Sequence, residues 1–190
     1  VGLSGLGGLV DWEIYNRPNI GSYVPKTFPV IWAREKGKAP VCRVLQGKPL
    51  PPFQGGGGGD PNANGEGLPH MDACTFRGEF PFAHIDFASK ALPVAVALEA
   101  YNPFIPSNAD DSGFPAAVLK YTVTNRTKNP VEATVAWNVL NTVGSIGVSD
   151  KDLTFNKTEF GYGQNVNEFV DDGGVRGLVF RSEKWAAGHP

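Results

Sequence analysis

The chain has 190 residues, of which 41% are hydrophobic and 19% charged, and its formal net charge is −2. A chain of this length can bury about 70% of its extended surface, which favours one folded domain over a disordered tail. The near-neutral charge excludes the basic surface typical of nucleic-acid-binding proteins, and the apolar runs are far shorter than the about 20 residues that a membrane helix needs.

The first ten residues, VGLSGLGGLV, have neither a cationic start nor a long apolar run. No signal peptide or transmembrane segment is therefore predicted in this chain, and the compartment stays open. The glycines of this segment lack the third glycine and the preceding strand of a dinucleotide-binding motif, so the pattern excludes a Rossmann unit.

Strands are predicted along most of the chain, because apolar and polar residues alternate with a period of two and helical periodicity is absent. The weaker candidates are bounded by Gly, Pro, Asn or Asp, whereas the clearest ones contain long alternating runs. The weaker strands are residues 28–34, 41–45, 74–80, 82–87 and 175–181, and the clearest are residues 94–100, 117–125 and 131–139. Many short strands of this kind indicate an all-β fold, an antiparallel β-sandwich, spanning residues 1–190.

Residues 46–69 contain five consecutive glycines at 55–59 and five prolines. Such a segment offers little side-chain surface to offset its ordering entropy, and we expect a long mobile loop. Cys42 and Cys74 lie in strand-like runs on either side of it. They form either one disulfide that closes the loop or two buried free thiols, and neither belongs to a C-x-x-C pair typical of zinc or redox sites.

The two clearest neighbouring strands are joined by residues 125–130, Asn-Arg-Thr-Lys-Asn-Pro, which are turn-forming types. We therefore expect residues 118–139 to form an antiparallel hairpin with one apolar face buried. The side chains expected on that face are Leu119, Tyr121, Val123, Val135 and Trp137.

Oxygen-bearing side chains from Asn108 to Ser112, followed by Gly113, match the first half of an EF-hand loop. The twelfth position is Leu119 instead of Glu, and nearby prolines disfavour flanking helices, so a capped turn is favoured over a calcium site. The three histidines, His70, His84 and His189, are too scattered to predict a metal or catalytic cluster. We assign no metal ligand, no catalytic residue and no cofactor to this chain.

Three segments, residues 11–18 (DWEIYNRP), 76–83 (FRGEFPFA) and 98–106 (LEAYNPFIP), occur in order along the chain. Together they resemble the N-terminal domain of glycoside hydrolase family 116, which includes bacterial β-glucosidases and the non-lysosomal glucosylceramidase. Residues 108–112 (NADDS) and 125–127 (NRT) continue the similarity, which extends to about Gly147.

The resemblance implies a β-sandwich packed on a C-terminal (α/α)6 barrel that carries the nucleophilic Glu and the acid/base Asp of a retaining mechanism. No segment here matches that barrel, so we expect an incomplete N-terminal domain whose catalytic partner lies downstream. The parent protein is then expected to cleave a β-glucoside or glucosylceramide-like substrate without a cofactor, whereas this segment alone is not.

Polar residues within the similar motifs are the candidates for contact with the substrate or with the barrel, and interdomain packing or turn stabilisation is the favoured role. These candidates are Asp11, Trp12, Asn16, Arg17, Asn102, Asn108, Asp110 and Asp111.

The alternative is a non-catalytic carbohydrate-binding or surface-assembly module, with a tryptophan as an exposed sugar platform. Its candidates are Trp12, Trp32, Trp137 and Trp185, although Trp137 lies on the apolar face of its predicted strand and is expected in the core. The full-length gene sequence discriminates between the two hypotheses.

Overall fold

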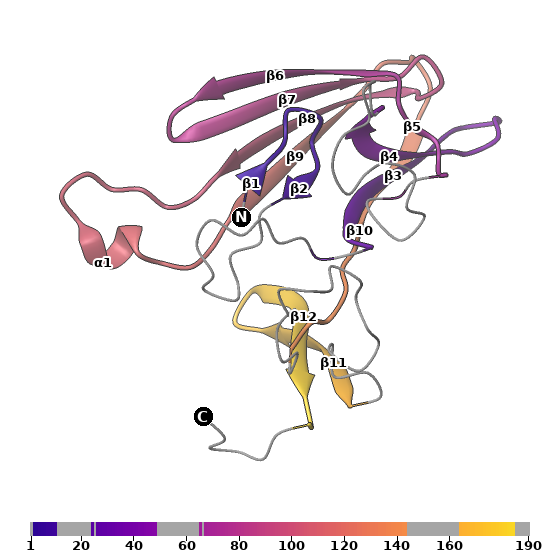
Figure 1. The fold of residues 1–190 in the computed structure, drawn as a ribbon. Coiled ribbons are helices and arrows are strands. Elements are labelled where there is room, and N and C mark those ends of the chain that lie inside the picture. Colours follow the sequence, from indigo (N-terminus) through magenta and orange to yellow (C-terminus); the bar gives the residue numbers. More distant parts are fainter. Residues whose placement is uncertain are drawn as a thin grey trace. The chain divides into compact units, whose positions relative to one another are not determined.

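A computed structural model describes residues 2–10, 24, 26–48, 65, 67–143 and 164–184. Within these residues the chain forms twelve strands and one short helix (Figure 1). The structure separates into two compact units, residues 1–139 and 140–190, and each is described by itself. The expectation of a single domain across residues 1–190 stays a prediction.

The first unit contains two four-stranded sheets, in the orders β10-β3-β4-β5 and β6-β7-β8-β9. Their strands are β3 (Phe28–Glu35), β4 (Val41–Gly47), β5 (His70–Met71), β6 (Ala73–Glu79), β7 (Phe82–Ala88), β8 (Val94–Tyr101), β9 (Val118–Asn125) and β10 (Val131–Asn138). Neighbouring strands are antiparallel except β4 and β5, which are parallel. A hairpin of β1 (Gly2–Leu3) and β2 (Leu9–Val10) precedes them.

Buried side chains from both sheets form one core, which makes the unit a β-sandwich and confirms the predicted fold class. Every second residue of β8, from Val94 to Ala100, is buried, as the alternation predicted. Ile31, Ala33 and Leu45 of the other sheet belong to the same cluster and have no exposed surface.

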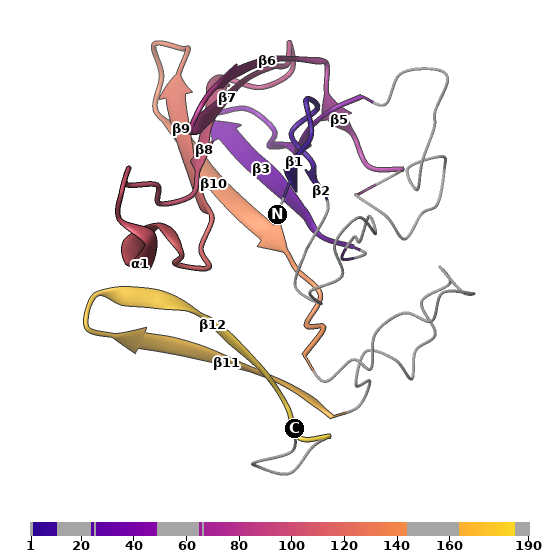
Figure 2. The same ribbon diagram turned by 60° about the vertical axis from the view of Figure 1, so that its left-hand side comes forward.

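The predicted hairpin of residues 118–139 is wrong. β9 pairs with β8 and β10 pairs with β3, so two consecutive strands lie in opposite sheets (Figure 2). Alternation shows which face of a strand is apolar. Strands of both sheets bury one face in the shared core and so have the same pattern, which therefore does not specify the strand with which each one pairs. Tyr121 and Trp137 are only partly buried and meet edge to face with ring centroids 6.3 Å apart. Val123 was also expected to be buried, but it is 36% exposed.

A tight turn joins β1 to β2 and lies against both sheets. The Ser4 hydroxyl accepts a hydrogen bond from the backbone N–H of Gly8 at 3.0 Å, and the Leu6 carbonyl accepts one from Gly47 at 2.8 Å. Gly7 has a φ of +91°, and a Cβ on it would lie 2.8 Å from the ring of Phe87. The glycines of the N-terminal segment therefore permit close packing against the core.

The long loop begins later than predicted, because Gln46 and Gly47 belong to β4. Its glycine run lies outside the described residues, so the expected mobility of the loop stays a prediction.

Both cysteines are free thiols, which answers the alternative that the sequence left open. Cys42 is exposed, contrary to the expected burial, because it alternates away from the core on β4. Cys74 is half-buried, with its thiol donating to the Gly5 carbonyl at 3.4 Å.

The second unit contains a hairpin of β11 (Asn165–Asp172) and β12 (Val175–Ser182). β12 was predicted, but β11 was not, because its sequence NVNEFVDD is rich in residues that are rare in strands. Asn141 is 7% exposed, and its amide nitrogen lies within hydrogen-bond distance of the carbonyls of Val166 and Arg181. This amide ties the start of the second unit to both strands of the hairpin.

Candidate functional site

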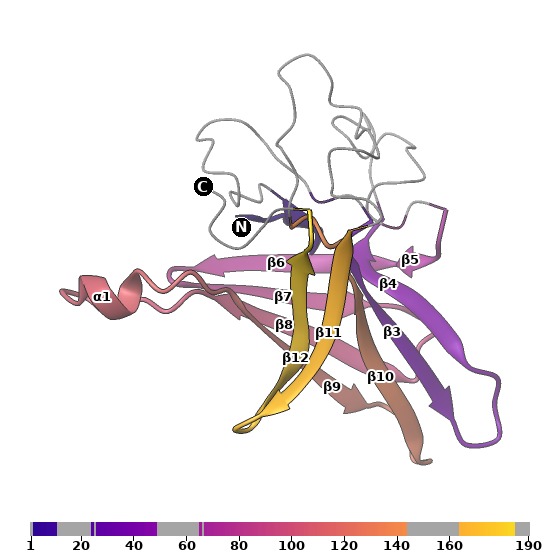
Figure 3. The same ribbon diagram turned by 90° about the horizontal axis from the view of Figure 1, so that it is seen from below.

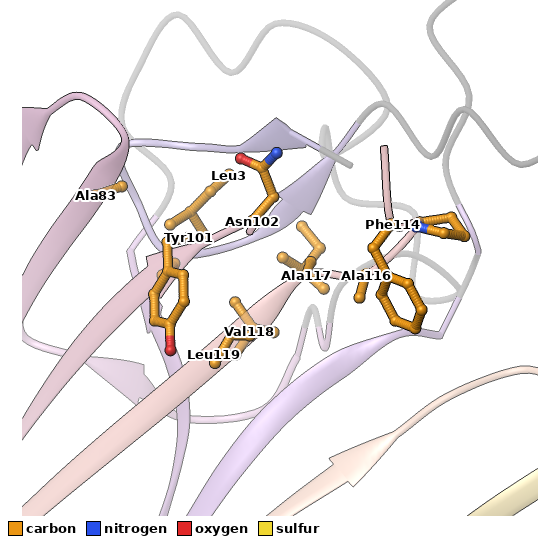
Figure 4. Close-up of a pocket in the computed structure, with 12 residues that line it drawn as sticks. Leu3, Ala83, Tyr101, Asn102, Phe114, Ala116, Ala117, Val118 and Leu119 are labelled. Carbon is orange, nitrogen blue, oxygen red and sulfur yellow. The ribbon is translucent and has the colours of Figure 1, made fainter. Parts of the chain in front are cut away.

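A pocket of about 800 Å³ lies at the end of the sandwich where β8 ends and β9 begins (Figure 4). Residues of the β1–β2 hairpin, β7, β8, β9 and the connection into β9 line it. The lining residues are Leu3, Leu9, Ala83, Ala100, Tyr101, Asn102, Phe114, Pro115, Ala116, Ala117, Val118 and Leu119.

The lining is almost wholly apolar: of its residues, only Tyr101 and Asn102 have polar side chains. Acid–base or nucleophilic catalysis needs a carboxylate, imidazole, thiol, amine or activated hydroxyl in reach of the substrate. The lining offers an amide and a phenol instead, so this pocket can bind apolar groups but holds no acid–base pair. Among the residues that the structure describes, no cluster of His, Cys, Asp or Glu could hold a metal ion.

Exposed phenylalanines lie on the connections at this end of the sandwich. Phe80, in the β6–β7 turn, is 84% exposed, and its ring meets that of Phe104 edge to face, with centroids 5.2 Å apart. Phe104 is 46% exposed and Phe114, in the pocket lining, is 65% exposed. We refer to Phe80, Phe104 and Phe114 as the aromatic rim. Large exposed apolar side chains that gather in this way mark an interaction surface.

The connection from β8 to β9 projects beyond the strands and contains the helix α1 (Ala109–Ser112) (Figure 3). Asn108 caps this helix: its side-chain oxygen accepts from the Asp111 N–H at 3.1 Å, and its amide donates to the Asp111 carboxylate at 2.6 Å. The Ser112 hydroxyl holds the loop closed through two 2.9 Å hydrogen bonds to the backbone of Ile105. The predicted cap is present, but the capped segment is one turn of α-helix where a turn between strands was expected.

The structure describes four of the eight candidate residues, one in the pocket lining and three at α1. Asn102 lines the pocket, and Asn108, Asp110 and Asp111 lie at α1, between Phe104 and Phe114 in the chain. Asp11, Trp12, Asn16 and Arg17 lie outside the described residues. A role in contact with substrate or with another domain stays a prediction for all eight.

The aromatic rim was missed by the sequence reasoning, which concentrated on polar residues. A signal was present: each of the three phenylalanines is adjacent to a proline, Phe80 at the last position of a predicted strand and the other two between predicted strands. A large apolar side chain in a turn has no strand face that would bury it, so Phe beside Pro in a connection indicates surface exposure.

Charged groups with perturbed pKa values lie elsewhere and are structural. Glu35, at the end of β3, accepts hydrogen bonds from Lys38 and Asn129, both at 2.7 Å, and these lower the pKa of its carboxyl group. The backbone N–H of Lys90, 2.8 Å from Asp72, lowers the pKa of that carboxyl group. Both carboxylates join turns of the sandwich, away from the pocket lining.

The fold is an antiparallel β-sandwich, and the pocket where β8 ends and β9 begins is lined by no acid–base residue. Residues 1–189 match the family described as beta-glucosidase 2, glycosyl-hydrolase family 116 N-term. The chain therefore belongs to the N-terminal domain family of glycosyl hydrolase family 116, as the resemblance of its motifs indicated. No curated protein matches the chain. Within the described residues, no helix is long and apolar enough to cross a membrane.

Proposed function

We propose that this chain is the N-terminal support of a retaining β-glucosidase or glucosylceramidase-like enzyme, whose catalytic groups lie in an (α/α)6 domain outside this sequence. The family membership supports the association with β-glucosidases. A retaining mechanism needs two carboxyl groups about 5–5.5 Å apart across the scissile bond. The pocket of this chain is lined by no carboxylate, in keeping with a binding role instead of a catalytic one.

The aromatic rim is the observation that carries the proposal, and it is the surface that we assign to the catalytic domain. Aromatic side chains are enriched at the centre of protein interfaces, where they contribute most of the binding free energy. Phe80 has most of its surface in solvent, and Phe114 lines a pocket able to receive apolar side chains from a partner. Asn102, Asn108, Asp110 and Asp111 would then contact the catalytic domain or shape the loop that does so.

The experiment expresses this chain and the catalytic domain as separate polypeptides and measures their association. The double variant Phe80→Asp/Phe104→Asp is expected to weaken association about 30-fold or more, since it places two carboxylates in an apolar contact. Lys128→Asp, in the exposed β9–β10 connection, is the matched control and should leave association unchanged. Unaltered association of the double variant would remove the rim from the interface.

A further inference from the structure

The outer face of the β6–β9 sheet carries two adjacent rows of side chains that alternate away from the core. Because Leu98 and Ala100 point inward on β8, Glu99 and Tyr101 point outward, and the strand register aligns the neighbours of each. The first row is Arg77, His84, Glu99 and Lys120, and the second is Glu79, Phe82, Tyr101 and Val118.

Aromatic rings occupy the middle of this face. Phe82 is 40% exposed, and its ring centroid lies 5.2 Å from that of Tyr101, with the planes tilted by 60°. The His84 ring stacks beside Phe82 at 6.2 Å and 29°. A solvent-facing ring offers its π-face to the C–H groups of a pyranose, a contact in which the edge of one molecule meets the face of the other.

The charges in these two rows are paired with one another. Arg77 lies 2.8 Å from Glu79, and Lys120 lies 3.3 Å from Glu99, so each cation has a carboxylate beside it. Asp86, the next outward residue of β7, adds one exposed carboxylate to the same face, so no excess of positive charge is present to select a phosphate or an acidic peptide. Their exposed N–H groups and carboxylate oxygens nevertheless can serve as donors and acceptors for hydroxyl groups.

We propose that this face binds a neutral oligosaccharide, with a sugar ring on Phe82 and Tyr101 and hydroxyl groups at the charged row. Aromatic surface combined with mutually neutralised donors and acceptors matches an uncharged polyhydroxylated ligand. The tryptophan platform considered from the sequence is less suitable, because Trp32 and Trp137 are both less exposed than Phe82. Trp12 and Trp185 lie outside the described residues.

The test titrates the 190-residue chain with cellohexaose by calorimetry, and follows the backbone amide resonances by NMR. Phe82→Ala should weaken binding about tenfold, and the resonances that shift should include those of β7 and β8. Glu99→Ala, which removes an acceptor at a half-buried position of the charged row, should also weaken binding and serves if Phe82→Ala fails to fold. Trp32→Ala, on the opposite sheet, is the matched control and should bind as the unaltered chain does.

Absence of binding at about 10 mM cellohexaose would overturn the proposal. It would also be overturned if both Phe82→Ala and Glu99→Ala bound cellohexaose as tightly as the unaltered chain does. Loss of binding in Trp32→Ala would move the site to the other sheet. The double variant Phe80→Asp/Phe104→Asp should retain binding, because neither residue belongs to the two rows. Failure of this proposal is therefore distinguishable from failure of the domain-docking proposal.

Discussion

At the scale of single residues, several positions are determined by close contacts that only the folded chain reveals. Gly7 illustrates this: its positive φ and its distance from Phe87 both exclude a side chain. Glu35 is a second case, since its carboxylate joins the β3–β4 turn to Asn129 in the β9–β10 connection. Neither role follows from the residue type, and each yields a stability prediction.

Gly7→Ala should destabilise the chain more than Gly37→Ala does. Both glycines have positive φ, +91° and +82°, but a Cβ on Gly37 meets nothing within 4 Å. Gly37→Ala should therefore lower the free energy of unfolding by about 1 kcal/mol through backbone strain alone. Gly7→Ala should cost about 1–3 kcal/mol more, because the ring of Phe87 is buried and must shift. Urea unfolding measures both, and equal losses would contradict the close packing of the N-terminal turn.

Glu35→Gln should destabilise the chain near neutral pH and lose its effect in acid. Hydrogen bonds from Lys38 and Asn129 hold the pKa of Glu35 below its ordinary 4.5. The carboxylate therefore contributes stability that is present above its unfolded-state pKa and is lost as the pH falls through the lowered folded-state value. Unfolding curves over this pH range should converge for the two proteins. Glu132→Gln, in an exposed pair with Arg34, is the control and should show little effect. A loss of stability in Glu35→Gln that does not change with pH would argue against a contribution from the Glu35–Lys38 ion pair.

At the scale of elements, the alternation of the sequence predicted the sandwich strands well, because burial of one face imposes a period of two. Their pairing was less predictable: β9 and β10 have matching patterns and a turn between them, yet each pairs with an earlier strand. β11 was missed because its residue types are rare in strands, and the buried amide that contacts both strands of its hairpin lies outside the strand. The pocket could not be predicted either, since its lining joins β1, β2 and three later strands that only the fold brings together.

Asn141→Ala should loosen the β11–β12 hairpin. Two-stranded hairpins are marginally stable alone, and the Asn141 amide contacts the Asn167 side chain at 2.8 Å as well as carbonyls of both strands. Removing it takes away a donor that both strands share, at a cost of about 1 kcal/mol. Hydrogen exchange should show faster exchange of the β11 and β12 amides, whereas Asn102→Ala, an exposed amide in the first unit, should not. Unchanged protection would mean that another contact holds the hairpin.

At the scale of the whole molecule, the chain combines a well-formed core with an unusually apolar end. The core of the first unit is built from buried side chains of both sheets. The aromatic rim does not share in this burial, although Phe80 and Phe104 contact each other. Such a distribution is typical of a domain that folds around its own core and binds a partner through one end.

The activity of the isolated chain and of the full-length protein should differ. The 190 residues alone should not turn over an aryl β-glucoside, whereas the full-length protein should hydrolyse it with retention of the anomeric configuration. In the full-length protein, Phe80→Asp/Phe104→Asp should lower the midpoint of thermal unfolding more than kcat, because the rim is assigned to docking instead of chemistry. Product analysis by NMR and thermal unfolding measure the two effects. Hydrolysis by the isolated chain that is abolished by changing one of its own carboxylates would place the chemistry in the sandwich, and a full-length protein inactive on every β-glycoside tested would favour a binding module.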